Sequence, residues 1–445
     1  MHNFHSRNTV RYYLLVIILL AFLFFSNDFG LIDVQKTAIV MAAGIDREED
    51  GFILTSQIAV PQSSSQGNSS QAVQLVSRGK TVSEAFEQIN TKTGWYPKLV
   101  FCKLIVIGEK AAQDNVFDAL DFFLLDEYLA DDCQVAVCEG LAKDVLNVSP
   151  LVDPSSSVAI GKVLSAHAER VGTVRPTTLK DFAIGYFGDS RSALLPVLKT
   201  EPQQEEISSS NPSKNSGQGG QGSDESQSGS EEQSGGDSQS EESEQSGKSQ
   251  SGSEEQNSGE SGQGGKSQNG GEKPQNKPVF SARQTALFVR GKWRGTLTPE
   301  ETFAVNAAIG KLRLANYSVD YDGQTCTLTV KRNAPKIKLE VGKDGSSRVQ
   351  VQLTMTAGIA DYSKALNVNE LADAGDIPDG IFFAAEKKLA AELTTAYEKA
   401  RKVGCDVFGL EERLVKYKKR EYHQHKDSLL EKSSLTVKVR FEGVR

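Results

Sequence analysis

The chain has few of the residue types from which catalytic and metal sites are built. Its 445 residues include five histidines, and two of them, His2 and His5, precede an apolar N-terminal run. His423, His425 and Asp427 would share one face of a strand, but their surroundings are rich in Lys and Arg, which is typical of a solvated surface. No Gly-x-Ser-x-Gly, His-Glu-x-x-His or phosphate-binding loop is present. We therefore predict no catalytic residue, no metal ligand and no bound cofactor.

Two stretches match ligand-binding motifs only in form. Residues 46–51 begin like a calcium loop, but the twelfth position is Gln57 instead of Glu, and a strand is expected from Phe52. We interpret these residues as a hairpin turn. Residues 217–222 have the glycine spacing of a dinucleotide-binding motif, but no strand precedes them and no helix follows, so we do not assign a nucleotide site.

Cysteine is also scarce, with five residues at positions 102, 133, 138, 326 and 405. Cys133 and Cys138 are five positions apart, so on one strand their side chains point to opposite faces and cannot pair readily. No cysteine spacing resembles a zinc site. We predict no disulfide framework.

The folded parts lack an excess of either charge, because most of the negative charge lies in one segment. Residues 201–280 contain 15 acids and 5 lysines, a net of −10, whereas the whole chain is −8, so the remainder sums to about +2. This balance excludes the basic domain of a nucleic-acid binder, and we predict no nucleic-acid partner. Residues 201–277 are Ser/Gly/Gln/Glu-rich without an aromatic residue, and we expect a disordered tether.

What the chain does have is an uninterrupted apolar run, residues 12–25, near its N-terminus. Cations precede the run and acids follow it, which favours a cytoplasmic N-terminus, an exported chain and a lipid-bilayer contact. As a helix, its 14 residues span about 21 Å, somewhat less than a hydrocarbon core of about 30 Å. We predict an uncleaved signal anchor, a transmembrane helix whose anchoring residues include Tyr12, Leu15, Ile18, Leu20, Phe22 and Phe25.

Two alternatives to this anchor remain open: an atypical cleaved signal and a buried helix of a cytosolic domain. A cut after Ser26 would place Phe24 at the −3 position, where a small residue is needed. A lipid-modified cysteine would have to follow the run directly, but the first cysteine is Cys102. Residues beyond 30 are therefore interpreted as extracytoplasmic.

The pattern of elements predicts an α+β (mixed α/β) chain of two or three domains with central mixed or antiparallel sheets covered by helices. We expect an anchor region at 1–30, an α/β region at 31–199, the disordered linker at 200–279 and an α+β domain at 280–445. In the first folded region, strands are expected at 37–45, 52–60, 99–108 and 133–138, with a polar loop at 62–71. Helices are expected from 81, at 115–125, 141–146, 156–168 and 178–187.

The C-terminal region shows the clearest periodicity. A hairpin is expected at 286–296, followed by a helix that Thr298 caps. Alternating apolar residues then predict an antiparallel meander at 326–330, 337–341 and 349–355, with Asp-Gly turns at 322–323 and 344–345. A long amphipathic helix at 378–402 would cover one face of the meander, and 435–441 forms a last strand.

Four stretches of the sequence form a set of motifs: 37–46 (TAIVMAAGID), 99–109 (LVFCKLIVIGE) with the following helix 119–123 (ALDFF), 286–301 (ALFVRGKWRGTLTPEE), and the long helix running into 406–409 (DVFG). In this order they resemble the Ger(x)C family, the GerAC-like C subunits of spore germinant receptors. Lys103 stands where the family often has His, Glu411 where Gly is common, the linker is unusually long, and no lipid-modified Cys is present. The resemblance covers roughly 330 residues. It implies structural roles for Gly44, Asp46, Gly108, Asp121, Phe122, Thr298, Glu301, Asp406, Phe408 and Gly409.

The resemblance further implies a non-enzymatic subunit on the outer side of the spore inner membrane. Its partners would be the multi-spanning A- and B-type receptor subunits, which sense nutrients and conduct ions, together with the lipid bilayer. The subunit would be required for germination as a scaffold or a signal-coupling element. An anchored cell-envelope binding protein or enzyme unrelated to germination is the competing hypothesis.

Overall fold

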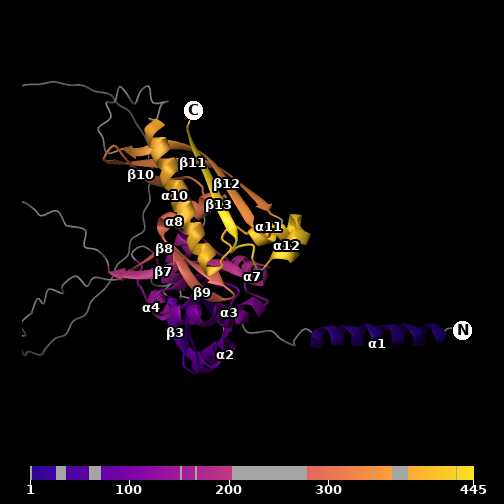
Figure 1. Ribbon diagram of the computed structural model, residues 1–445. Coiled ribbons are helices and arrows are strands. Elements are labelled where there is room, and N and C mark those ends of the chain that lie inside the picture. Colours follow the sequence, from indigo (N-terminus) through magenta and orange to yellow (C-terminus); the bar gives the residue numbers. More distant parts are fainter. Residues whose placement is uncertain are drawn as a thin grey trace, which may run out of the picture. The chain divides into compact units, whose positions relative to one another are not determined.

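A computed structural model describes residues 3–26, 37–59, 72–150, 153–165, 168–202, 278–342, 344–362, 379–426 and 428–444 (Figure 1). Apart from the N-terminal helix α1 (Asn3–Ser26), these residues build two β-sheets with helices packed on them. The expected polar loop at 62–71 lies outside the described residues. Of the disordered linker expected at 200–279, residues 203–277 lie outside the described residues, whereas 200–202 and 278–279 belong to strands. The predicted fold class is confirmed.

The first sheet has nine strands in the order β3-β2-β1-β5-β6-β7-β8-β9, with β4 paired to β1. The central strands β1, β5, β6 and β7 run parallel, and antiparallel strands flank them on both sides. Sequence patterns indicated β1, β2, β6, β8 and β9 but not β3, β4 or β7. The strands are β1 (Thr37–Glu48), β2 (Gly51–Ala59), β3 (Ala72–Gly79), β4 (Tyr96–Lys98), β5 (Leu104–Ile107), β6 (Gln134–Cys138), β7 (Ser192–Pro202), β8 (Pro278–Val289) and β9 (Lys292–Leu297).

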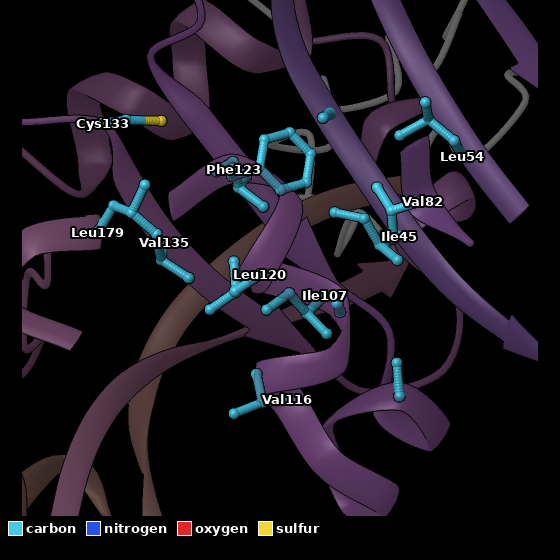
Figure 2. Packing of buried hydrophobic residues seen from close by; sticks show 14 of the residues in the cluster. Ile45, Leu54, Val82, Ile107, Val116, Leu120, Phe123, Cys133, Val135 and Leu179 are labelled. Carbon is cyan, nitrogen blue, oxygen red and sulfur yellow. The ribbon is translucent and has the colours of Figure 1, made fainter. Parts of the chain in front are cut away.

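Both faces of this sheet are buried, which explains the apolar run of its central strand. Along β5, Ile105 and Ile107 enter the core on one face, whereas Leu104 and Val106 enter the core on the other. The first core is shown in Figure 2, where Ile107, Val116, Leu120, Phe123 and Val135 lie together. A strand covered on both faces reads as a continuous apolar stretch.

Helices on the two faces supply the rest of these cores. Helices α2 (Val82–Thr93), α3 (Glu109–Leu125) and α7 (Leu179–Phe187) contribute to the first core, and α4 (Ala142–Leu146) and α5 (Ser156–Val163) to the second. A short helix, α6, spans Ala168–Val171. Cys133 and Cys138 lie in different cores, as their spacing predicted, and all five cysteines are buried and free.

Strands β7 and β8 are neighbours in the first sheet, although residues 203–277 separate them in the sequence. Ser192 is opposite Val289 at one end of this antiparallel pair, and Pro202 is opposite Pro278 at the other. Side chains of β8 face both ways, since Ala286 and Phe288 join the first core while Leu287 joins the core of the second sheet. The β8–β9 hairpin belongs to the first sheet, and its side chains pack into the cores of both sheets. The predicted domain limits, 31–199 and 280–445, stay a prediction.

The second sheet has the order β10-β11-β12-β13. Its first three strands form the predicted antiparallel meander, and β13, the predicted last strand, pairs parallel to β12, so the sheet is mixed. The two strands expected at 326–330 and 337–341 are one strand, with irregularities in its pairing near Thr327 and Val330. The strands are β10 (Ala315–Tyr321), β11 (Gln324–Val341), β12 (Ser347–Tyr362) and β13 (Ser433–Gly443).

Two helices cover one face of this second sheet. Helix α8 (Pro299–Ala308) and the long helix α10 (Asp379–Val403) bury their apolar residues against it, as predicted for α10. In Figure 1, α10 runs along β10 and β13. Helices α11 (Leu410–Tyr417) and α12 (Lys419–His425) follow, with a small core around Leu414, Tyr422 and Leu429.

Helix α1 carries the predicted anchor residues. Tyr12, Leu15, Ile18, Leu20 and Phe22 are exposed, and the side chain of Phe25 lies outside the described residues. Within the described part of the chain, no helix is long and apolar enough to cross a membrane. The prediction of a transmembrane helix is therefore not supported.

Candidate functional site

The first family stretch ends in a buried carboxylate, Asp46, at the end of strand β1. Its Oδ1 accepts the backbone N–H of Ala142 at 2.7 Å, and its Oδ2 accepts that of Lys143 at 3.1 Å. Both N–H groups belong to the first turn of α4, which has no other side-chain cap. A carboxylate at a helix N-terminus compensates unpaired N–H groups. We call this arrangement the Asp46 joint.

Two glycines allow the close approach that the Asp46 joint requires. A Cβ on Gly108 would lie 2.0 Å from Asp46 Oδ1, and a Cβ on Gly44 would lie 2.8 Å from Leu146 Cδ1. Next to Gly108, the carboxylate of Glu109 accepts the backbone N–H of Gly140 at 3.0 Å. The first two family stretches therefore meet at the carboxyl ends of the parallel strands, although they are distant in sequence.

The location of the Asp46 joint bears on function, because ligands of α/β sheets bind outside the carboxyl ends of the strands. Here the protein's own carboxylate takes the N–H groups that an anionic ligand would need. Burial raises the pKa of Asp46, while the hydrogen bonds from Ala142 and Lys143 act in the opposite direction. This edge of the sheet is filled by a structural contact.

The third family stretch forms the start of α8. Thr298 Oγ1 accepts the N–H of Glu301 at 3.3 Å, and the Glu301 carboxylate accepts the N–H of Thr298 at 2.9 Å, a complete capping box. Glu301 is buried and forms a 2.7 Å ion pair with Lys399 of α10. At the other end of the helix, Asn306 donates to the carbonyl of Gly172 at 2.9 Å. Helix α8 is thereby fixed to both halves of the chain.

The last family stretch contains a second buried carboxylate, Asp406. Its Oδ1 accepts the N–H of Phe408, just before α11, at 3.2 Å, and its Oδ2 accepts that of Glu411, in the first turn of α11, at 2.9 Å. Its own N–H donates to Ser192 Oγ at the start of β7, at 3.0 Å. We call this arrangement the Asp406 joint, and it ties the C-terminal helices to the first sheet. Burial raises the pKa of Asp406, against the backbone hydrogen bonds.

The neighbours of Asp406 complete the joint. The Phe408 ring stacks on Tyr397 of α10, with 5.4 Å between centroids. Gly409 precedes α11 with φ of 64°, in the left-handed region that glycine adopts without strain. The Tyr397 hydroxyl in turn donates a hydrogen bond to Ser433 Oγ of β13 at 2.5 Å.

The remaining predicted motif residues, Asp121 and Phe122, lie apart from both joints on α3. The Asp121 carboxylate accepts the N–H of the next residue, Phe122, at 2.7 Å. The Phe122 ring packs on Phe86 of α2, 5.1 Å between centroids. In the described residues, no group of three or more His, Cys, Asp or Glu side chains could hold a metal ion.

The molecule has a large hollow of about 1250 Å³, which we call the basic cleft. Its walls are the α7–β7 turn, the β8–β9 turn, the C-terminal end of α10 and helix α12. Seven Lys or Arg side chains line it against three acids. The cations are Arg191, Arg290, Lys292, Arg294, Arg401, Lys402 and Lys426, and the acids are Asp189, Glu411 and Glu431.

Two family models match the sequence in the order of its folded parts. The model described as the spore germination protein N-terminal domain matches residues 31–200, and the model described as spore germination B3/GerAC like, C-terminal, matches residues 283–443. The chain belongs to the GerAC family of spore germination proteins. The family inferred from its four sequence stretches is thus confirmed, and with it a role in spore germination.

The crystal structure of the GerBC protein is similar to this GerAC-family chain. It shares 14% sequence identity, with a TM-score of 0.47 over 91% of this chain and 97% of that chain. No curated protein matches the sequence.

Sequence reasoning identified both buried aspartates but not their partners. Asp46 contacts residues 96 and 97 positions away, and Asp406 contacts Ser192 at 214 positions. No local pattern indicates such pairs. The basic cleft was also missed, because its cations come from segments that are separate in sequence.

Proposed function

We propose that this GerAC-family chain is a non-enzymatic C subunit of a nutrient germinant receptor. It would couple the multi-spanning A- and B-type subunits, with its folded parts on the extracytoplasmic side of the spore inner membrane. The observation that carries the proposal is the match of both GerAC family models, in order, to the two folded parts of the chain.

The use of the family's own residues supports a scaffold. Asp46 and Asp406 accept backbone N–H groups, and Glu301 caps its helix and pairs with Lys399. These carboxylates are buried and bonded inside the protein, so they hold elements together instead of facing a substrate. A subunit that transmits a signal between partners requires such rigid connections between its parts.

The proposal takes the apolar residues of α1 to hold the chain at the membrane. Support comes from the exposure of Tyr12, Leu15 and Phe22 and from the cations that precede the run. Removing residues 1–26 should shift the chain from the spore membrane fraction to the soluble fraction. Mass spectrometry of the mature N-terminus is the matched check, since a start beyond residue 25 would remove these residues.

Deleting the gene tests the proposed role. Spores that lack the chain should lose their response to at least one nutrient germinant, measured as the fall in optical density after the nutrient is added. Reintroducing the intact gene should restore the response. Normal responses of the deletion strain to every nutrient germinant would contradict the proposal.

A further inference from the structure

A pocket of about 640 Å³ opens at the end of the first sheet where its parallel strands begin. Ile39 and Met41 line it from the start of β1, Lys103 from the position before β5, and Gln134 from the first position of β6. Phe101 and helix α5 complete the lining. We call this hollow the strand-start pocket. The Asp46 joint lies at the opposite end of the same strands.

The strand-start pocket presents mainly apolar side chains. Ile39, Met41 and Val158 are half-buried, and Phe101 is 59% exposed. Met41 lies where the pairing of β1 with β2 shifts its register, and such bulges redirect a side chain. The flexible thioether of methionine adapts to the shape of an apolar or aromatic neighbour.

The polar side chains around the pocket are bonded within the protein. Ser165 Oγ donates to a carbonyl in the last turn of α5 at 2.6 Å, and Ser157 Oγ lies 2.9 Å from Ser155 Oγ. The Gln134 amide nitrogen donates to the carbonyl of Leu164 at 3.0 Å. Its Oε1 has no partner among the described residues, but this atom is buried. The accessible wall therefore offers apolar contact instead of hydrogen bonds.

The charged side chains of the pocket are paired as well. Lys103 forms an ion pair with Asp132 at 3.1 Å, and Lys162 forms one with Asp153. An ionic ligand would have to compete with these pairs or bury its charge unpaired, which costs free energy. The pocket therefore selects against charged ligands.

We propose that the strand-start pocket binds a neutral, largely apolar small molecule. Its volume of about 640 Å³ lies within the range of roughly 300–1,000 Å³ that is typical of small-molecule sites. A helix about 10 Å in diameter would fill this volume within two turns, so the pocket suits a small molecule better than a protein segment. The proposal is an addition to the receptor role and does not depend on it.

A glycine on α5 keeps the pocket open. Gly161 lies inside this helix, where glycine is destabilising relative to alanine. A Cβ at this position would meet no atom of the described residues within 4 Å, and the backbone is not in the left-handed region. Neither packing nor backbone conformation therefore requires glycine here. A larger side chain would extend into the pocket.

Photolabelling of the full-length protein with benzophenone tests the proposal. Benzophenone is neutral and apolar, and on irradiation it attaches to C–H bonds that it contacts. We expect adducts on Met41 or Phe101, located by peptide mass spectrometry. Excess diphenylmethane, which has the same two rings but is not photoreactive, should suppress them by competition. Gly161→Leu should lower the labelling about tenfold, because its side chain takes the place of buried ligand surface.

Two variants serve as matched controls. Gly161→Ala adds a Cβ that meets no described atom and should retain the labelling. Lys110→Leu adds an apolar side chain at an exposed position of α3 outside the pocket and should also retain it. The thermal midpoints of both Gly161 variants should not fall, because alanine and leucine favour a helix over glycine.

Three results would overturn the proposal. One is labelling of Met41 or Phe101 that Gly161→Leu leaves unchanged. Another is labelling that spreads over exposed apolar residues such as Tyr417 and persists in excess diphenylmethane. The third is a protein crosslink that p-benzoylphenylalanine at position 101 forms in spores and that Gly161→Leu abolishes, since a partner's side chain would then occupy the pocket.

Discussion

The two sheets of this protein bury their strands in different ways. In the first sheet, neighbouring residues of β5 enter separate cores, so every position of the strand is buried. In the second sheet, β12 alternates, with Val351 and Leu353 buried and Gln352 exposed. One sheet lies between two helix layers, whereas the other is covered on one face by α8 and α10.

This difference determines where substitutions are tolerated and where the chain can meet partners. The first sheet has no free face at its centre, so its contribution to an interaction must come from its edges and turns. The second sheet has a polar face with exposed side chains. The two joints also connect different parts of the protein. The Asp46 joint connects elements of the first sheet and its helices, whereas the Asp406 joint connects the C-terminal helices to the first sheet.

The largest expected effect is on the free energy of unfolding when neighbouring positions of β5 and of β12 are replaced. Leu104→Ala and Ile105→Ala in β5 should each lower the free energy of unfolding by about 2–5 kcal/mol, because each leaves a cavity in a different core. In β12, Leu353→Ala should lower the free energy of unfolding by a similar amount, but Gln352→Ala should change it by less than about 0.5 kcal/mol. Denaturant titration measures all four. Tolerance at either Leu104 or Ile105 would show that β5 is not buried on both faces.

A smaller effect is expected when the Asp46 joint is overpacked. Gly108→Ala would place a Cβ against Asp46 Oδ1, whose position is fixed by two hydrogen bonds, and should cost about 1–3 kcal/mol. Gly295→Ala is the control, because its Cβ would meet Leu287 and Val403 at ordinary contact distance, 3.6 Å. Thermal unfolding of both variants decides the point, and an equal loss in the two would contradict the steric account.

At the Asp406 joint, Asp406→Ala should cost about 1.5–3 kcal/mol, because the N–H groups of Phe408 and Glu411 lose a charged acceptor. Ser192→Ala removes only the acceptor of the Asp406 N–H and should cost about 1 kcal/mol. Amide hydrogen exchange adds a local measurement. Exchange should speed up in α11 and leave α4 unchanged, and a change in α4 would show that the two joints are not independent.

The smallest effect concerns pH. Burial raises the pKa of Asp46 and of Asp406 above the unfolded value of about 3.9. The native state therefore binds these protons more tightly, so their contribution to stability is full below pH 3.9 and is lost as pH rises through the native pKa values. When the pH is lowered from 7 to 4, the free energy of unfolding should rise less for the Asp406→Asn variant than for the unsubstituted protein. An equal gain, measured by denaturant titration, would contradict the raised pKa of Asp406.

Local sequence signals predicted those features that depend on neighbouring residues. Thr298 marked the start of α8, and Asp322–Gly323 marked the turn before β11, where both residues have positive φ. The apolar run 99–108 was assigned to one strand, but only 104–107 are a strand. Leu99 and Cys102 close a turn, with the Cys102 N–H donating to the Leu99 carbonyl at 2.8 Å. Hydrophobicity alone does not distinguish a buried turn from a buried strand.

Features that depend on distant partners could not be predicted. Alternation in β13 indicated a strand but carries no information about direction, so its parallel pairing with β12 was missed. Strands β7 and β8 pair although residues 203–277 lie between them in the sequence. The same limitation hid the contacts of Asp46 and Asp406.

The measurement that tests the proposed function most directly is affinity purification of the tagged chain from dormant-spore membranes, followed by mass spectrometry. We expect two multi-spanning receptor subunits to co-purify with the chain. Recovery of the folded chain at normal abundance without any multi-spanning partner would contradict the account.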